Sequence, residues 1–275
     1  MKTFDRGKIR AIAIGGFDGI HRGHQQLFKE LGSNGGILVI DTEHTNLTPK
    51  DYREKYVDFP VFYLDLPDIL QLTPEEFIEM LKVRFPKLEK IVVGYDFRFG
   101  HKRSGEAKDI PRYFDGEVMV VSEVKVDGIS VHSRTIRGYI RVGDMEQAKK
   151  LIGRHYSISG DVISGQGIGM RRLYPTLNLN VRQFLLPGEG VYATRTCIKG
   201  KRYDSVTFIG HRVTTDGGFS VETHILGEVI ESGIEEADIE FVKKMRDNMM
   251  FAELEDLKTQ ISTDIAQAKE ILKKD

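Results

Sequence analysis

The sequence is short of the residues that mark secreted and membrane proteins. Among its 275 residues there is no tryptophan and a single cysteine, Cys197, so no disulfide can form within the chain. A lone cysteine fits a reducing compartment. No apolar run approaches the ~20 residues that a membrane-spanning helix needs, and the N-terminal string MKTFDRGK is too polar for a signal peptide. We therefore expect a cytoplasmic protein without a membrane span.

An excess of charge of either sign is also missing. The 40 Lys and Arg residues balance 41 Asp and Glu residues to a net charge of -1. A balanced chain has no general attraction for nucleic acid, so we expect no nucleic-acid partner. The composition, with 40% hydrophobic residues, is globular, and the length suits one large or two ordinary domains. The sequence leaves weak self-association open.

The most informative stretch is residues 12–27, which read IAIGGFDGIHRGHQQL. An apolar strand at 12–14 stops at glycines, and helical spacing of apolar residues begins after Gly23. Unpaired backbone N–H groups at a helix start carry partial positive charge, which makes such a turn a phosphate seat. His21 and His24 are three apart in the first turn, so both can face the same anion. The alternative is an ordinary strand-to-helix turn with two surface histidines.

Apolar strands alternate with helices through the first half of the chain. Strands are expected at residues 12–14, 37–40, 61–64, 91–93 and 118–121. One helix is expected to begin at a capping box on Thr73, and another to run from an Asp144 cap to a Gly153 stop. This alternation predicts a parallel sheet covered by helices, with ligands at the carboxyl ends of its strands.

The second half has a different texture, with short β-rich runs separated by turns. Their spacing predicts a small antiparallel barrel. We place the boundary after residue 152, which gives domains at 1–152 and 153–275. Apolar residues at spacings of three and four over 251–272 predict an amphipathic helix that packs by one face.

Two further segments carry candidate ligand groups. In GYDFRFG at 94–100, Asp96 and Arg98 could face a ligand cleft, or Asp96 could simply cap a turn while the phenylalanines join the core. In GQGIGMRRLYPTLN at 165–178, glycines could cradle a nucleotide while Thr176 and Asn178 offer oxygens to Mg²⁺. The two oxygens would point the same way on an extended segment. The alternative there is a loop leading into a strand.

These motifs together resemble one family. GGFDGIHRGH resembles the nucleotidyltransferase signature of bifunctional riboflavin kinase/FMN adenylyltransferases, and PTLN resembles the PTxN motif of riboflavin kinases. GRHYSISGDVISG and LLPGEGVYA, on either side of PTLN, resemble the same family. The resemblance implies a Rossmann-like α/β nucleotidyltransferase domain, followed by a small antiparallel β-barrel riboflavin kinase domain with a C-terminal helix.

The resemblance also implies roles for residues of the first domain. It implies ATP binding by Gly16, Phe17, Asp18, His21, His24, Ser133 and Arg134. Asp96 and Arg98 would line the flavin and ATP cleft, and the two histidines would be catalytic by stabilising phosphate charge. The family's usual Ser-Ser-Thr-Arg string reads His-Ser-Arg-Thr at 132–135, so Arg134 and Thr135 are exchanged.

In the second domain, the resemblance implies ATP binding by Gly165, Gly167, Thr176 and Asn178. Thr176 and Asn178 would also hold Mg²⁺, and Arg246 would help to hold the flavin. Glu222 would be the catalytic glutamate that accepts the proton of the ribityl hydroxyl. Strand alternation places Ser220, Glu222 and His224 on one face and Val221, Thr223 and Ile225 on the other.

The implied function is FAD synthesis from riboflavin, with riboflavin, FMN and ATP as substrates and Mg²⁺ as cofactor. The second domain would phosphorylate riboflavin to FMN. The first would adenylylate FMN to FAD and release pyrophosphate. Two alternatives stay open: a riboflavin kinase whose adenylyltransferase half is impaired by the exchange at 134–135, and a non-catalytic flavin or nucleotide-binding protein.

Overall fold

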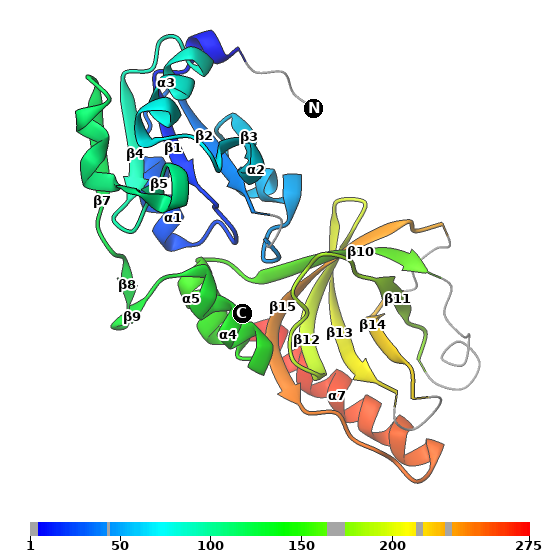
Figure 1. Cartoon of the computed structure of the whole chain (residues 1–275). Coiled ribbons are helices and arrows are strands. Elements are labelled where there is room, and N and C mark those ends of the chain that lie inside the picture. The colour runs from blue at the N-terminus through cyan, green and yellow to red at the C-terminus, as the bar shows by residue number, and fades with distance from the viewer. Residues whose placement is uncertain (1–4, 43–44, 164–173, 213–216, 229–232) are drawn as a thin grey trace. The chain divides into compact units, whose positions relative to one another are not determined.

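A computed structural model of the chain describes residues 5–42, 45–163, 174–212, 217–228 and 233–275 (Figure 1). Backbone contacts divide the chain into two compact units, Met1–Ser133 and Arg134–Asp275. This division falls earlier in the chain than residue 152, because α5 (Met145–Ile152) packs against strands of the second unit. The boundary at 152/153 stays a prediction about the family's domains.

The first unit is built on a parallel sheet. Its strands are β1 (Ala11–Gly15), β2 (Gly35–Asp41), β3 (Val61–Asp65), β4 (Lys90–Gly94) and β7 (Glu117–Val121), in the order β3-β2-β1-β4-β7. All five predicted strands are confirmed. The connections run outward in opposite directions from the neighbouring strands β1 and β4. The carboxyl ends of these two strands therefore form the switch point at which parallel sheets bind ligands.

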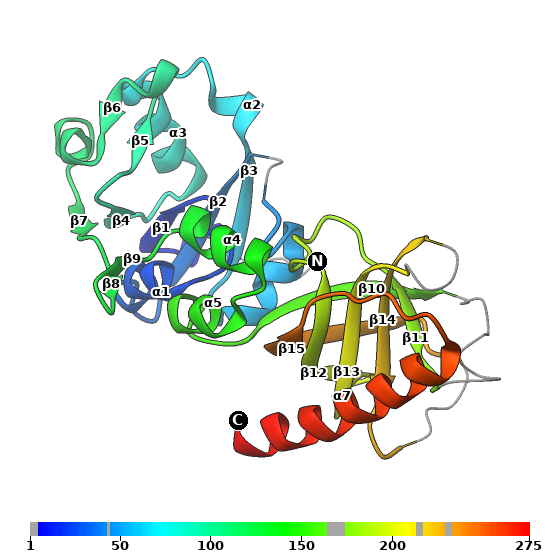
Figure 2. The same ribbon diagram turned by 90° about the horizontal axis from the view of Figure 1, so that it is seen from below.

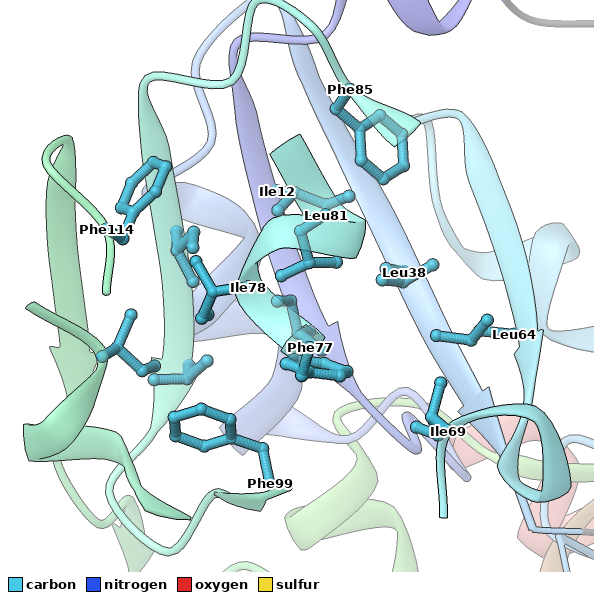
Figure 3. Close-up of a cluster of buried hydrophobic side chains, with 14 of the residues drawn as sticks. Ile12, Leu38, Leu64, Ile69, Phe77, Ile78, Leu81, Phe85, Phe99 and Phe114 are labelled. Atoms are coloured by element: carbon cyan, nitrogen blue, oxygen red, sulfur yellow. The ribbon is translucent and has the colours of Figure 1, made fainter. Parts of the chain in front are cut away.

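Both faces of this sheet are buried by helices. On β1, Ile12 lies in one core cluster with Phe77, Ile78 and Leu81 of α3 (Pro74–Arg84) (Figure 3). Ile14 belongs to the same cluster. Ala11 and Ala13 point to the other face, which is covered by Leu27 and Phe28 of α1 (Arg22–Lys29). The α3 capping box predicted from Thr73 is confirmed: its hydroxyl accepts from the Glu76 N–H, and the Glu76 carboxylate accepts from the Thr73 N–H.

Short elements complete the first unit. They are α2 (Leu66–Ile69), the 3-10 turns η1 (Arg6–Lys8), η2 (Lys50–Tyr56), η3 (His101–Arg103) and η4 (Ala107–Arg112), and the strand pairs β5 (Arg98–Phe99) with β6 (Gly105–Glu106) and β8 (Lys125–Val126) with β9 (Ile129–Ser130). Helix α4 (Ser133–Val142) follows, and α5 has the predicted Asp144 cap and a left-handed Gly153 at its end.

The second unit is a closed antiparallel barrel, which confirms the predicted class (Figure 2). Its strands are β10 (Tyr156–Ile163), β11 (Leu177–Asn180), β12 (Gly190–Ile198), β13 (Lys201–His211), β14 (Phe219–Ile225) and β15 (Glu236–Arg246), in the order β10-β11-β14-β13-β12-β15. Helix α7 (Leu254–Lys274) contacts β12, β13 and β15. None of the helices among the described residues is long and apolar enough to cross a membrane.

Hydroxyl groups fill part of the barrel interior. The side chains of five fully buried residues bond to one another at 2.7–3.2 Å: Thr194, Thr196, Ser205, Thr207 and Thr223. Thr223 joins this network from β14, and its neighbours in sequence, Glu222 and His224, are only partly buried. The predicted alternation of β14 is therefore confirmed.

A buried ion pair fastens α7 to the barrel. The Asp264 carboxylate, with 3% of its side chain exposed, accepts bonds from the Arg246 guanidinium at 3.0 Å (Nε to Oδ1) and 2.7 Å (Nη2 to Oδ2). Gln260 Nε2 donates to the same carboxylate at 2.9 Å. Two parallel bonds of this kind fix the rotation of the helix as well as its position.

We predict that Asp264→Asn lowers the free energy of unfolding by about 3 kcal/mol, because Arg246 keeps its charge and loses its counter-ion in a buried place. Urea denaturation measures this. Glu255→Gln on the same helix is the matched control, since its ion pair with Lys258 is exposed and its loss should cost less than about 0.5 kcal/mol. Equal stability of the two variants would contradict the role of the pair.

Candidate functional site

The turn between β1 and α1 has a backbone with several positive φ angles, a conformation that favours glycine. Phe17, Gly19 and Ile20 have φ angles of 47°, 90° and 41°. A Cβ atom on Gly19 would lie 2.9 Å from the Leu47 side chain, so the turn closes tightly on the loop beneath it. Left-handed backbone at non-glycine positions is costly and concentrates at functional sites.

The two histidines of the motif lie together where α1 begins. His21 is the N-cap, so it precedes the first helical turn in which the sequence placed it, and its Nδ1 accepts from the His24 N–H at 3.3 Å. The imidazole rings stack with centroids 3.5 Å apart, and the Phe17 ring meets His24 edge-on at 5.1 Å. A helix start that carries two imidazoles is suited to an anion.

Asp18 of the same motif is turned into the protein. It is 5% exposed, and its carboxylate accepts from the backbone N–H groups of Leu47 and Thr48 at 3.0 Å each and of Asn46 at 3.3 Å. The Thr48 hydroxyl in turn accepts from the Gly19 N–H at 2.7 Å. Asp18 therefore shapes the turn, and direct binding of ATP by Asp18 stays a prediction.

Two residues from distant segments join this turn. The Ser133 hydroxyl donates to the Asp18 carbonyl at 2.8 Å, which brings the predicted Ser133 to the glycine turn. Arg53, which is 1% exposed, donates to the Gly16 carbonyl at 3.0 Å and to the Thr45 hydroxyl at 3.1 Å. Nothing in the polar string around Arg53 marks it in the sequence, because its role depends on a tertiary contact.

In the segment after β4, residues 96–99, the apolar and the polar side chains have different surroundings. Phe99 is buried in the core cluster and the partly buried Phe97 packs against it, whereas Asp96 and Arg98 are exposed. Arg98 pairs with Glu106 on the neighbouring strand β6. The cleft role of Asp96 and Arg98 stays a prediction, and the core role of the two phenylalanines is confirmed.

A second contact joins this segment to residue 132. The Tyr95 hydroxyl lies 3.2 Å from His132 Nε2. Desolvation first, and then the Asp96 carboxylate, raise the pKa of Tyr95. Ser133 and His132 thus reach the ends of β1 and β4. Arg134 is an exposed residue in the first turn of α4 and belongs to the second unit.

A polar cluster lies on the outer face of the barrel where β11 pairs with β14. Asn178 is the register partner of Glu222, and the Thr176 hydroxyl lies 3.5 Å from Glu222 Oε2. On the other side of the carboxylate, Arg212 Nη1 lies 3.5 Å from Glu222 Oε1. The structure thus brings three predicted residues together and adds Arg212. The predicted Gly165 and Gly167 lie outside the described residues.

A pocket of about 310 Å³ adjoins this cluster. Its polar lining comes from Asn178, Asn180, Arg212 and Ser220, and its apolar lining includes Leu179 and Phe219. No group of three His, Cys, Asp or Glu side chains that could hold a metal occurs among the described residues. Hydroxyl, amide and single carboxylate oxygens suit Mg²⁺, which keeps waters and substrate phosphates as its other ligands.

Arg246 is engaged by the protein itself. Its Nε and Nη2 bind Asp264, and its Nη1 donates to the Asp247 carbonyl at 3.0 Å. These bonds give Arg246 a structural role, which is to hold α7 against the barrel. Flavin binding by Arg246 stays a prediction.

We predict that Asp18→Asn speeds amide hydrogen exchange at residues 46–48 and destabilises the fold by about 2 kcal/mol, because an amide cannot accept three N–H bonds as a carboxylate does. Exchange measured by mass spectrometry reports the loop directly. Asp96→Asn, at an exposed site, is the matched control and should leave both quantities unchanged. An unaltered exchange rate in Asp18→Asn would refute the loop-holding role.

Comparisons with known proteins cover most of the chain. A family model described as riboflavin kinase matches residues 152–272, and one described as FAD synthetase matches residues 41–135. The bifunctional riboflavin kinase/FMN adenylyltransferase of Buchnera aphidicola is 32% identical over 96% of this chain and 93% of its own length. Its namesake from Listeria monocytogenes is 30% identical over 93% and 90%.

One solved structure is similar over nearly its full length. It is the crystal structure of a macrolide-efflux protein, so named, from Streptococcus pneumoniae, with a TM-score of 0.83 and 26% identity. The match covers 95% of this chain and 94% of that one.

Proposed function

Because the chain belongs to the family of bifunctional riboflavin kinase/FMN adenylyltransferases, we propose that it makes FAD from riboflavin in two steps. The barrel unit transfers the γ-phosphoryl group of ATP to riboflavin and gives FMN. The FMN phosphate then attacks the α-phosphorus of a second ATP at the first unit, which releases pyrophosphate. The observation that carries the proposal is the cluster of Thr176, Asn178 and Glu222 across β11 and β14.

In the kinase step, Glu222 accepts the proton of the ribityl hydroxyl as the new bond to phosphorus forms. A carboxylate is a weak base toward an alcohol, so positioning and charge neutralisation carry most of the acceleration. Strand β14 supplies the positioning, because its next residue, Thr223, is held by the buried hydroxyl network.

Mg²⁺ fits the donor set on this face of the barrel. Thr176 and Asn178 would hold the ion through oxygen atoms, beside the carboxylate of Glu222. Bound with ATP, it neutralises phosphate charge. The chain's own residues then fix where the phosphates lie relative to the ribityl hydroxyl.

In the adenylylation step, His21 and His24 stabilise negative charge on the phosphates at the start of α1. The attacking FMN phosphate is already an anion, so this step needs no general base. The glycine turn, which is held in place by bonds of Asp18 and Arg53, lets the backbone approach the nucleotide.

The exchange of Arg134 and Thr135 relative to the family's usual string favours a second candidate function, a riboflavin kinase with an impaired adenylyltransferase half. The expected cytoplasmic location and lack of a nucleic-acid partner stay predictions.

Glu222→Gln tests the kinase step. We predict at least a 10³-fold loss in the rate of riboflavin phosphorylation, because the amide cannot accept the proton. Binding of riboflavin, followed by the quenching of its fluorescence, should be the same as in the wild type. FMN and FAD are quantified together by chromatography. Adenylylation of FMN supplied directly should be unchanged, and this serves as the internal control for folding. Retained phosphorylation would exclude Glu222 as the base.

His24→Gln tests the adenylylation step, since this variant should lose adenylylation and keep phosphorylation. We predict a 10²- to 10³-fold loss of FAD formation from FMN, because one charge-stabilising group at the phosphates is gone. Phosphorylation of riboflavin should stay within twofold of the wild type. A variant that makes FAD at the normal rate would show that His24 does not act on the phosphates.

A further inference from the structure

The Glu222 carboxylate is approached from both sides by side chains of the barrel. Oε1 lies 3.5 Å from Arg212 Nη1, and Oε2 lies 3.5 Å from the Thr176 hydroxyl. Arg212 follows directly on β13, and Thr176 directly precedes β11, so the flanking groups come from the two strands that neighbour β14. The carboxylate thus has a distinct partner for each oxygen.

The backbone under Glu222 is already fixed. Glu222 has two register partners, Phe208 of β13 on one side and Asn178 of β11 on the other. The hydroxyl of the adjacent Thr223 lies in the buried network. The freedom that remains is rotation about the side-chain torsions of Glu222. A group that limits this rotation decides whether the accepting lone pair points at the substrate hydroxyl.

Arg212 is well placed to limit it. Its backbone N–H donates to the Gly218 carbonyl at 2.9 Å, and its carbonyl accepts from the Gly217 N–H at 3.1 Å, so the residue is held within the β13–β14 hairpin. About a quarter of each side chain of the ion pair is exposed, 24% for Arg212 and 22% for Glu222. A planar guanidinium orients a carboxylate better than an ammonium group does.

We propose that Arg212 is a positioning residue for the kinase step: it orients the Glu222 carboxylate toward the substrate hydroxyl, opposite the Thr176 contact. The 3.5 Å separations describe the protein without substrate, and such contacts shorten when substrate completes the site. The inference rests on the proposed kinase function and adds a residue to it. In this role Arg212 acts through the Glu222 carboxylate, which is the contact that the structure gives it at the site.

Arg212→Gln is the test, with total FMN and FAD formation as the measure of kinase turnover. We expect kcat to fall about 10²-fold, which is the cost of misplacing a reacting group, with KM for riboflavin and for ATP within threefold. Arg212→Lys should recover part of kcat, because it keeps the charge and loses the planar fork. Arg202→Gln is the matched control, since Arg202 lies on β13, the strand that Arg212 follows, and pairs with Glu240 at the surface.

Several results would overturn the inference. An unchanged kcat in Arg212→Gln would show that Glu222 is oriented without it. A raised KM for ATP at unchanged kcat would make Arg212 a nucleotide-binding residue of the adjoining pocket. If Arg212→Gln fails to fold, Arg212→Lys alone decides, and a kcat equal to wild type would reject the need for a planar fork. Lack of FMN formation by the wild-type chain would instead reject the proposed function.

Discussion

The pairing of β11 with β14 is the constraint on which the barrel site depends. Among the described residues, β11 and β14 have two pairs of register partners, Leu177 with Thr223 and Asn178 with Glu222, and this short ladder joins β11 to β14 in the closed barrel. A slip by one residue would turn Asn178 and Glu222 to opposite faces. The hydroxyl network inside the barrel opposes movement of β14 in such a slip, because Thr223 would have to leave its bonds with Thr196 and Thr207.

In the first unit the corresponding constraint is the tight turn after β1. Its backbone angles are tolerated because Asp18, Arg53 and Ser133 each hold a different part of the turn. Three of the chain's segments thus converge on a few residues of backbone. These bonds offset the conformational energy of the turn. The result is a preformed anion-binding site at the start of α1.

Much of this arrangement could be predicted from the sequence. Short apolar runs identified the five parallel strands, because both faces of that sheet are buried. β-rich runs separated by turns identified the barrel, and apolar residues at spacings of three and four identified α7, because it buries one face. The spacing of His21 and His24 placed both at one helix start, and alternation along β14 placed Glu222 on the face opposite Thr223. These inferences need only local geometry.

What escaped prediction depends on contacts between distant segments. Arg53 lies among other charged residues and Arg212 follows the end of a strand, so neither stands out in the sequence, and their contacts with Gly16 and Glu222 follow from the folded chain path. The pairing of Arg246 with Asp264 was missed for the same reason, since the helix spacing reveals a buried face and no partner. The division of the chain at Ser133 reflects the packing of α5, which has no local signal.

The most direct test of the account is a time course with the purified wild-type chain, riboflavin, ATP and Mg²⁺, with flavins separated at each time point. The account predicts that FMN appears first and FAD follows as FMN accumulates, with neither formed when ATP is omitted. FMN without FAD would contradict the two-step account and favour a kinase with an inactive first unit. Absence of both products would contradict the proposed function itself.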